Sequence, residues 1–285
     1  MPINTMLEQI PSALPLLLKA AGTGRRKPGR EPQIPALSTG IASLRADAAK
    51  LAAYCQVCGF EPGETLPITY PAVLANPLAM HLMSQPEFPL PMLGIVHVRN
   101  LIEQKRALRI DETYAVSVRT GGSRRVKAGL EFELVIEFSL EGEVLYTCTM
   151  GVLHRMPGPK QGGGSRPAAP PAQLAEYLAL DIPENQGRRY AAVSGDYNPI
   201  HLYTPTAKLL GFKRHIAHGM WSLARCAALL QAELGREPTV LDVSFKQPVF
   251  LPAKVAVKYQ RNAAGLDFAL LARSSDKVHL GGSLR

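Results

Sequence analysis

An aspartate and a histidine lie five residues apart in the segment YAAVSGDYNPIH, residues 190–201. Acid–base work on a substrate needs a carboxylate and an imidazole that are brought close together. Between Asp196 and His201, Asn198 and Pro199 favour a tight turn, and Gly195 frees the backbone at the bend. A turn of this kind after a helix aims both side chains into one cleft, and loops held by a rigid scaffold are common places for catalysis.

The same residues also have a purely structural interpretation. Asp196 and Asn198 are typical turn formers in a Gly-Asp-x-Asn-Pro sequence, and His201 would then be a histidine that only supports the fold. The chemistry of the segment by itself leaves both interpretations open.

The segment resembles the signature of the MaoC-like, or hydratase-2, family, which runs aromatic, then Ser-Gly-Asp-x-Asn-Pro-hydrophobe-His. Here it stands complete, with Tyr190 as the aromatic residue and Ser194 to His201 as the remainder. A second family element, Ala-His-Gly-Met, is present at residues 217–220, where an apolar helical segment starts. The two motifs cover only the second half of the chain, and the first half is similar in general layout.

The resemblance implies reversible addition of water to a trans-2-enoyl thioester, giving the (R)-3-hydroxyacyl form. Asp196 and His201 would hold the water between them, with the roles of acid and base unassigned. The backbone N–H of Gly219, at the start of a buried helix, would stabilise the charge on the thioester oxygen. The expected supporting residues of the turn are Ser194, Gly195 and Asn198.

No redox or metal cofactor is implied, since the substrate itself carries coenzyme A or an acyl carrier protein. Lys213 and Arg214 precede the helix and either contact coenzyme A phosphates or belong to a solvated loop. His215 and His218 flank the site in sequence, but a metal site would need a third ligand. We interpret His218 as structural, and Tyr190 as a residue that packs.

A Gly- and Pro-rich segment at residues 157–172 predicts a linker between residues 1–156 and residues 173–285. The two sides look like copies, because Tyr54, Val57 and Gly59 align with Tyr190, Val193 and Gly195. Each side carries an apolar helical segment, and alternating patterns predict antiparallel strands after it. The predicted helices are residues 77–84 and 219–232, and the predicted strands are residues 95–98, 113–119, 128–140, 143–152, 240–243, 254–261, 266–272 and 277–284.

An antiparallel sheet wrapped round one buried helix is the hot-dog arrangement. The sequence therefore predicts an α+β protein with a double hot-dog fold, a pseudo-dimer within one chain. In the first half, Phe60 stands where the catalytic aspartate would be and Thr65 where the histidine would be. That half cannot perform the same chemistry, so we expect one active site per chain, with the first half completing the fold and an acyl pocket.

The chain has 285 residues and a net charge of +9, with a basic cluster at Arg25, Arg26, Lys27 and Arg30. This cluster is a solvated loop, a nucleic-acid contact or a surface that attracts phosphate-bearing molecules such as coenzyme A. We expect the first of these, and no nucleic-acid partner. The motif of Cys55 and Cys58 falls late in a helical stretch, residues 48–58, which favours buried thiols over redox or zinc chemistry.

No apolar run reaches the roughly 18 residues that span a bilayer. The apolar stretch at residues 10–21 contains Pro11, Pro15 and Lys19 and lacks the charge arrangement of a signal peptide. We expect a cytoplasmic protein of fatty acid metabolism with a loosely packed or amphipathic N-terminus. A homodimer is left open.

Two other functions fit parts of the pattern. A thioesterase shares the hot-dog scaffold, although the Asp–His motif argues against it. A non-catalytic acyl-thioester-binding subunit would be favoured only if Asp196 or His201 were missing.

Overall fold

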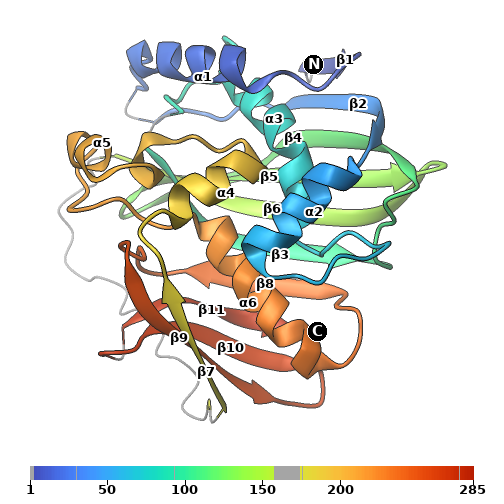
Figure 1. Cartoon of the computed structure of the whole chain (residues 1–285). Helices are drawn as coiled ribbons and strands as arrows, with labels where there is room; N and C mark the ends of the chain where they lie inside the picture. Colours follow the sequence, from blue (N-terminus) through green and yellow to red (C-terminus); the bar gives the residue numbers. More distant parts are fainter. Residues whose placement is uncertain (1–2, 30, 93, 157–173, 175, 276) are drawn as a thin grey trace.

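The fold is built on one continuous sheet of eleven strands, shown in Figure 1. The computed structural model describes all residues except 1–2, 30, 93, 157–173, 175 and 276. Along the sheet the strand order is β1-β2-β4-β5-β6-β3-β8-β11-β10-β9-β7. The strands are β1 (Ile3–Leu7), β2 (Leu37–Arg45), β3 (Ile95–Gln104), β4 (Thr113–Val126), β5 (Gly129–Leu140), β6 (Glu143–Arg155), β7 (Glu176–Ile182), β8 (Val240–Phe245), β9 (Ala253–Arg261), β10 (Leu266–Ala272) and β11 (Val278–Leu284).

Each half of the sheet carries its own long helix. In the first half this helix is α3 (Tyr70–Ser84), which packs against β2, β4 and β5. In the second half it is α6 (Gly219–Leu234), which packs against β8, β10 and β11. In Figure 1 both helices lie across the same face of the sheet. The predicted α+β double hot-dog is confirmed.

The helix of the first half is longer than predicted, because it begins at Tyr70 and not at Pro77. Pro71 lies in its first turn, where the missing N–H costs nothing, and Pro77 lies inside it. Eight residues of the helix are buried, so packing compensates for the backbone hydrogen bond that Pro77 removes.

The two halves meet at the antiparallel pair β3–β8, where Arg99 lies opposite Ser244 and Glu103 opposite Val240. Helix α6 also donates hydrogen bonds to the first half. Trp221 Nε1 and Arg225 Nη1 bond to the carbonyls of Val57 and Cys58, at 3.1 and 3.4 Å. These carbonyls belong to the last turn of α2 (Ala48–Cys58), so the second half supplies donors to the end of a helix in the first half.

The predicted repeat is visible where α2 and α4 (Gln186–Ser194) end. Both helices stop at a glycine in the left-handed region, Gly59 at φ 81° and Gly195 at φ 72°. Phe60 follows the first glycine and is buried, in the position that Asp196 occupies in the second half. The division at residues 157–172 stays a prediction, since this segment lies outside the described residues.

The N-terminus is more ordered than the sequence suggests. Strand β1 pairs in parallel with β2, and α1 (Ala13–Gly22) packs on α3. After the short helix η1 (Thr23–Arg25), the guanidinium of Arg26 donates hydrogen bonds to four carbonyls at the end of α3 and just beyond it, those of Met83, Ser84, Gln85 and Leu90. The prediction of a solvated loop is therefore wrong for Arg26; Arg30 of the same cluster lies outside the described residues.

All four cysteines are free and buried, as predicted for Cys55 and Cys58. Burial raises the pKa of Cys55 to about 11 and that of Cys58 to about 12. Thiols that resist ionisation are poor nucleophiles and poor metal ligands. No helix among the described residues is long and apolar enough to cross a membrane.

Candidate active site

The turn that carries Asp196 and His201 is held by its own side chains. Helix α4 ends at Ser194, whose Oγ accepts a hydrogen bond from Asp196 N at 3.2 Å. The backbone N–H of Asn198 donates to Asp196 Oδ1 at 3.1 Å, and Asn198 Oδ1 caps the short helix η2 (Pro199–His201). Ser194, Gly195 and Asn198 therefore lie where the sequence analysis expected supporting residues.

A glycine that the sequence analysis missed brings α4 against the end of this turn. A Cβ atom on Gly187 would lie 1.9 Å from the backbone oxygen of His201. Real Cβ atoms do not approach an oxygen this closely, so only glycine permits the contact. Because Gly187 has an ordinary backbone conformation, only knowledge of which segments pack together could have revealed it.

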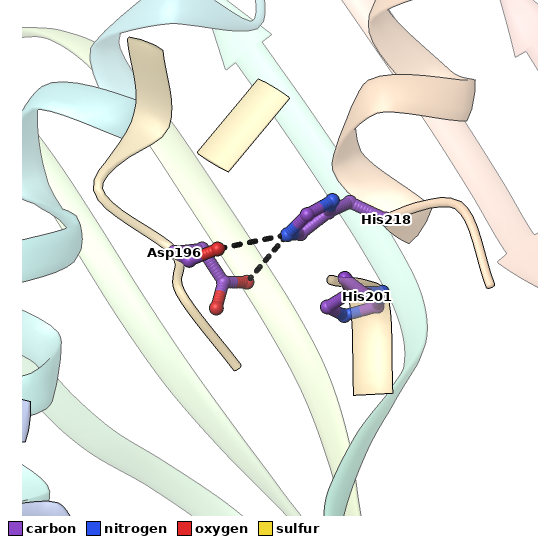
Figure 2. A group of neighbouring side chains, drawn as sticks. All are labelled: Asp196, His201 and His218. Carbon is purple, nitrogen blue, oxygen red and sulfur yellow. Dashed lines mark hydrogen bonds and ion pairs between the residues drawn. The ribbon is translucent and has the colours of Figure 1, made fainter. Parts of the chain in front are cut away.

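Figure 2 shows that His218 lies in the same cluster as Asp196 and His201. The two imidazole rings stack with their centroids 3.7 Å apart and their planes 25° from parallel. His218 Nε2 donates a hydrogen bond to the backbone oxygen of Asp196 at 2.9 Å and lies 3.8 Å from its carboxylate. The residue that we interpreted as structural thus contacts both members of the expected pair.

Hydrogen bonding assigns the proton on each ring. His201 Nδ1 lies 2.9 Å from the backbone oxygen of Ile216, and a carbonyl can only accept, so Nδ1 carries the proton. In the neutral ring Nε2 is then an unprotonated acceptor. By the same argument His218 carries its proton on Nε2, and its buried Nδ1 has no partner among the described residues.

The cluster combines a negative carboxylate with neutral rings. Burial lowers the pKa of His201 to about 3 and also lowers that of His218, with Asp196 opposing both shifts. The side chain of Asp196 keeps 44% of its surface exposed, so it is only partly removed from solvent. This partial desolvation works against its ionisation. Attraction to His218 and His201 when these rings are protonated, together with the hydrogen bond from the N–H of Asn198, outweighs the desolvation and holds the pKa of Asp196 below the usual value. At neutral pH Asp196 is therefore ionised and both rings are uncharged.

Gly219 is the first residue of α6, directly after His218. The first N–H groups of a helix have no partner within the helix, and the side chain of His218 does not cap them. A Cβ atom on Gly219 would lie 3.2 Å from the ring of Phe245, so the missing side chain leaves room beside these donors.

A histidine that the sequence analysis missed comes from the first half. The ring of His97 on β3 lies 4.9 Å from that of Phe245, and its buried Nε2 has no partner among the described residues. Pairing of β3 with β6 shifts register between His97 and Arg99, and such bulges redirect side chains. Burial lowers the pKa of His97 to about 4, with a hydrogen bond to the Arg99 backbone and the charge of Asp196 opposing the shift.

Three other residues that the sequence analysis considered lie outside the cluster. Lys213 and Arg214 are exposed, and neither forms an ion pair within the described part of the chain. His215 is buried between Thr204 Oγ1 and the backbone oxygen of Glu184, 2.9 Å from each. It therefore links the segment before α4 to the start of α5 (Thr204–Leu209) and does not face the Asp–His pair.

The cluster also meets the distance requirement of a metal site. One potential ligand atom from each of Asp196, His201 and His218 lies within 4.8 Å of the others. The third ligand that the sequence analysis did not find is therefore present. However, one nitrogen of each ring is already protonated and bound to a carbonyl, so a metal could use only the remaining nitrogen of each ring.

Comparison with known proteins adds a family match in the second half. Residues 164–270 match the MaoC like domain. The 3-hydroxyacyl-thioester dehydratase X of Mycobacterium tuberculosis is 33% identical over 280 residues, which are 96% of this chain and 98% of that protein. The (R)-specific enoyl-CoA hydratase of Aeromonas caviae is 31% identical over 98 residues, 33% of this chain and 73% of that protein.

A solved structure agrees with the sequence comparison. The crystal structure of HtdX of Mycobacterium tuberculosis superposes with a TM-score of 0.75 at 32% identity. The match covers 87% of this chain and 99% of that one, so it includes both halves of the sheet.

Proposed function

Because the chain belongs to the MaoC-like dehydratase family, we propose that this hydro-lyase interconverts trans-2-enoyl and (R)-3-hydroxyacyl thioesters at Asp196 and His201. The relatives are named for the two directions of this reaction, dehydration and hydration. Phe60 occupies the aspartate position of the first half, so the proposal includes one site per chain.

The observation that carries the proposal is the hydrogen bond between His201 Nδ1 and the backbone oxygen of Ile216. The Nδ1–H of His201 is fixed on this carbonyl, which leaves Nε2 as a free base beside the ionised carboxylate of Asp196. A water molecule held between these two groups offers one hydrogen to each. General acid–base catalysis needs a base within hydrogen-bond reach of the proton that it removes, and this arrangement supplies one for the water.

In hydration, His201 Nε2 takes one proton from the water while the water oxygen bonds to the β-carbon. Asp196 accepts a hydrogen bond from the other hydrogen, which stays on the new hydroxyl group. The imidazolium then delivers its proton to the α-carbon, so water is added and both residues return to their starting state. The low pKa of His201 makes this imidazolium a strong acid, which favours the delivery, and the charge of Asp196 stabilises it in the meantime.

As the water oxygen adds, negative charge moves to the thioester oxygen. In the proposal the N–H of Gly219 donates to this oxygen, because the start of a helix presents free amides and a positive dipole end. Donors of this kind contribute roughly 3 to 4 kcal/mol to the stability of a transition state.

The proposal needs no cofactor, since water is the only other reactant. It assigns the space within the Asp196, His201 and His218 cluster to water and not to a metal ion. A cytoplasmic location is part of the proposal, because four unpaired cysteines fit a reducing compartment. The absence of a nucleic-acid partner remains a prediction from the sequence, which leaves a homodimer open.

The test uses the purified protein and trans-2-enoyl-coenzyme A, with loss of the conjugated double bond followed by absorbance and the product analysed by chiral chromatography. We expect (R)-3-hydroxyacyl-coenzyme A, and a decrease in kcat of at least about 1000-fold in Asp196→Asn. Circular dichroism and Tm would show whether the variant is folded. Release of free thiol without loss of the double bond would replace the proposal with a thioesterase.

A further inference from the structure

The segment that follows the catalytic turn exposes apolar side chains to solvent. Of the eight large hydrophobic residues that are exposed in the described part of the chain, four fall between residues 197 and 210. Leu209 is 86% exposed, the highest value among them. Single exposed hydrophobic residues are ordinary, but a cluster beside an active site indicates a contact surface. The four are Tyr197, Tyr203, Leu209 and Leu210.

The charges of the same segment are all of one sign. From Tyr197 to Arg214 the chain has no Asp or Glu, whereas Lys208, Lys213 and Arg214 are exposed. None of these three cations makes an ion pair with a described residue. Elsewhere, exposed arginines such as Arg99 and Arg124 do pair with carboxylates. We call Tyr203, Lys208, Leu209, Leu210, Lys213 and Arg214 the α5 patch, after the short helix α5 (Thr204–Leu209) on which it is centred.

The α5 patch is tied firmly to the catalytic turn. Thr206 Oγ1 donates to the backbone oxygen of Pro199 at 2.7 Å, so α5 is attached to the helix that carries His201. Buried His215 bonds to Thr204 at the start of α5, and Arg188 stacks over the Tyr203 ring at 4.7 Å. In Figure 1, α5 lies at the left edge of the molecule, and it contacts the short helix η2. A partner bound here would therefore hold a fixed position relative to the Asp–His pair.

We propose that the α5 patch docks an acyl carrier protein, and that the substrate arrives as a thioester on this acidic protein. The inference rests on the proposed function. Uncompensated cations attract an acidic partner and speed its encounter, and the exposed leucines bury apolar surface once it is bound. Coenzyme A phosphates would account for Lys213 and Arg214 but not for two exposed leucines.

A transient contact suits this role. The carrier must leave after every turnover, and short-lived complexes bury less surface than stable ones. The thioester lies at the end of a flexible arm on the carrier, so the docking surface needs only to lie beside the active site and not over it.

The test compares one acyl group, trans-2-octenoyl, on three carriers: an acyl carrier protein, coenzyme A and N-acetylcysteamine. N-acetylcysteamine offers only the thioester end of the arm, so its turnover reports the chemistry without docking. We expect kcat/KM for the wild-type protein to be at least tenfold higher on the carrier protein than on coenzyme A. We also expect 0.5 M salt to reduce the former value by at least fivefold, because screening removes the electrostatic attraction.

The variant is Lys208→Glu with Leu209→Ser, which reverses one charge and removes the most exposed leucine. A matched control, Lys19→Glu with Leu18→Ser, changes the same residue types at exposed positions of α1. We expect the α5 variant to lose at least tenfold more kcat/KM on the carrier protein than on N-acetylcysteamine, and the control to lose no more than twofold on any substrate.

Three results would overturn the docking proposal. The α5 variant could leave turnover of the carrier-protein substrate unchanged, or it could lose the same factor on all three substrates. The wild-type protein could also prefer coenzyme A. Failure of the proposed function would give a different result. The wild-type protein would then hydrate none of the three thioesters, including that of N-acetylcysteamine.

Discussion

Replacing His97 with phenylalanine should make the stability of the protein less sensitive to acid. Burial holds the pKa of His97 near 4, whereas the unfolded chain binds the same proton at about 6.5. Protons therefore favour the unfolded state as the pH falls. The contribution of His97 to stability is complete above about pH 6.5 and is lost progressively as the pH falls toward 4.

The size of the His97 contribution to stability follows from the pH interval between its unfolded and folded pKa values. Between pH 6.5 and pH 4.5 the loss covers about two pH units, and each unit is worth about 1.36 kcal/mol, so His97 accounts for about 2.7 kcal/mol. Other buried histidines whose pKa is lowered, such as His201, His218 and His279, destabilise the protein in the same direction as the pH falls, but they are present in both proteins. Their effect cancels when the two proteins are compared.

The assay is urea unfolding of the wild-type protein and His97→Phe at pH 7.0 and pH 4.5. The wild-type free energy of unfolding should fall by about 2.7 kcal/mol more than that of the variant over this interval. A difference below about 0.5 kcal/mol would mean that His97 titrates close to pH 6.5. The ring would then be solvated, and the argument that burial keeps the histidines of the candidate site neutral would lose its basis.

Three further substitutions test two close contacts at the candidate site and the contact of Arg26 with the end of α3. Gly187→Ala places a methyl group against the His201 carbonyl, so it should cost about 2 to 3 kcal/mol in urea unfolding and lower kcat, while an unchanged kcat would contradict the contact. Gly219→Ala forces the Phe245 ring to move by a few tenths of an ångström, so we expect kcat to fall about tenfold with little change in Tm. If the variant and the wild-type protein had equal kcat values, Gly219 would not belong to the oxyanion site. Arg26→Met removes the donor to four carbonyls near the end of α3 and should lower the free energy of unfolding by about 2 to 3 kcal/mol with kcat intact; a loss below about 0.5 kcal/mol would show that solvent replaces these bonds.

The turn that carries Asp196 and His201 could be predicted from the sequence because its causes are local. Gly195 ends a helix in a conformation that favours glycine, Asn198 caps the next turn, and Pro199 fixes its start. Each residue acts on neighbours within a few positions, so one short motif contains all the residues that shape the turn. The strands were also found where alternation was clear, with ends that agree within a few residues for β9 and β10.

The contacts between distant segments could not be predicted in this way. The approach of Gly187 to His201 depends on how α4 meets η2, and the place of His97 depends on the β3 bulge and the β3–β8 seam. The strand prediction at residues 95–98 also stopped too early. The charges of Arg99 and Glu103 suggest a solvent-exposed segment, but both residues continue β3 in the middle of the sheet. Strands β1, β2 and β7 were not anticipated.

The continuous β3–β8 pair has a consequence for how the enzyme behaves on dilution. His97 reaches the site from one half, and Trp221 and Arg225 of the other half bond to α2. Since both halves belong to one chain, their effective concentration is set by the connection between them and not by the amount of protein in solution. Specific activity should therefore hold constant down to nanomolar enzyme, at which an association between separate chains of modest affinity would come apart.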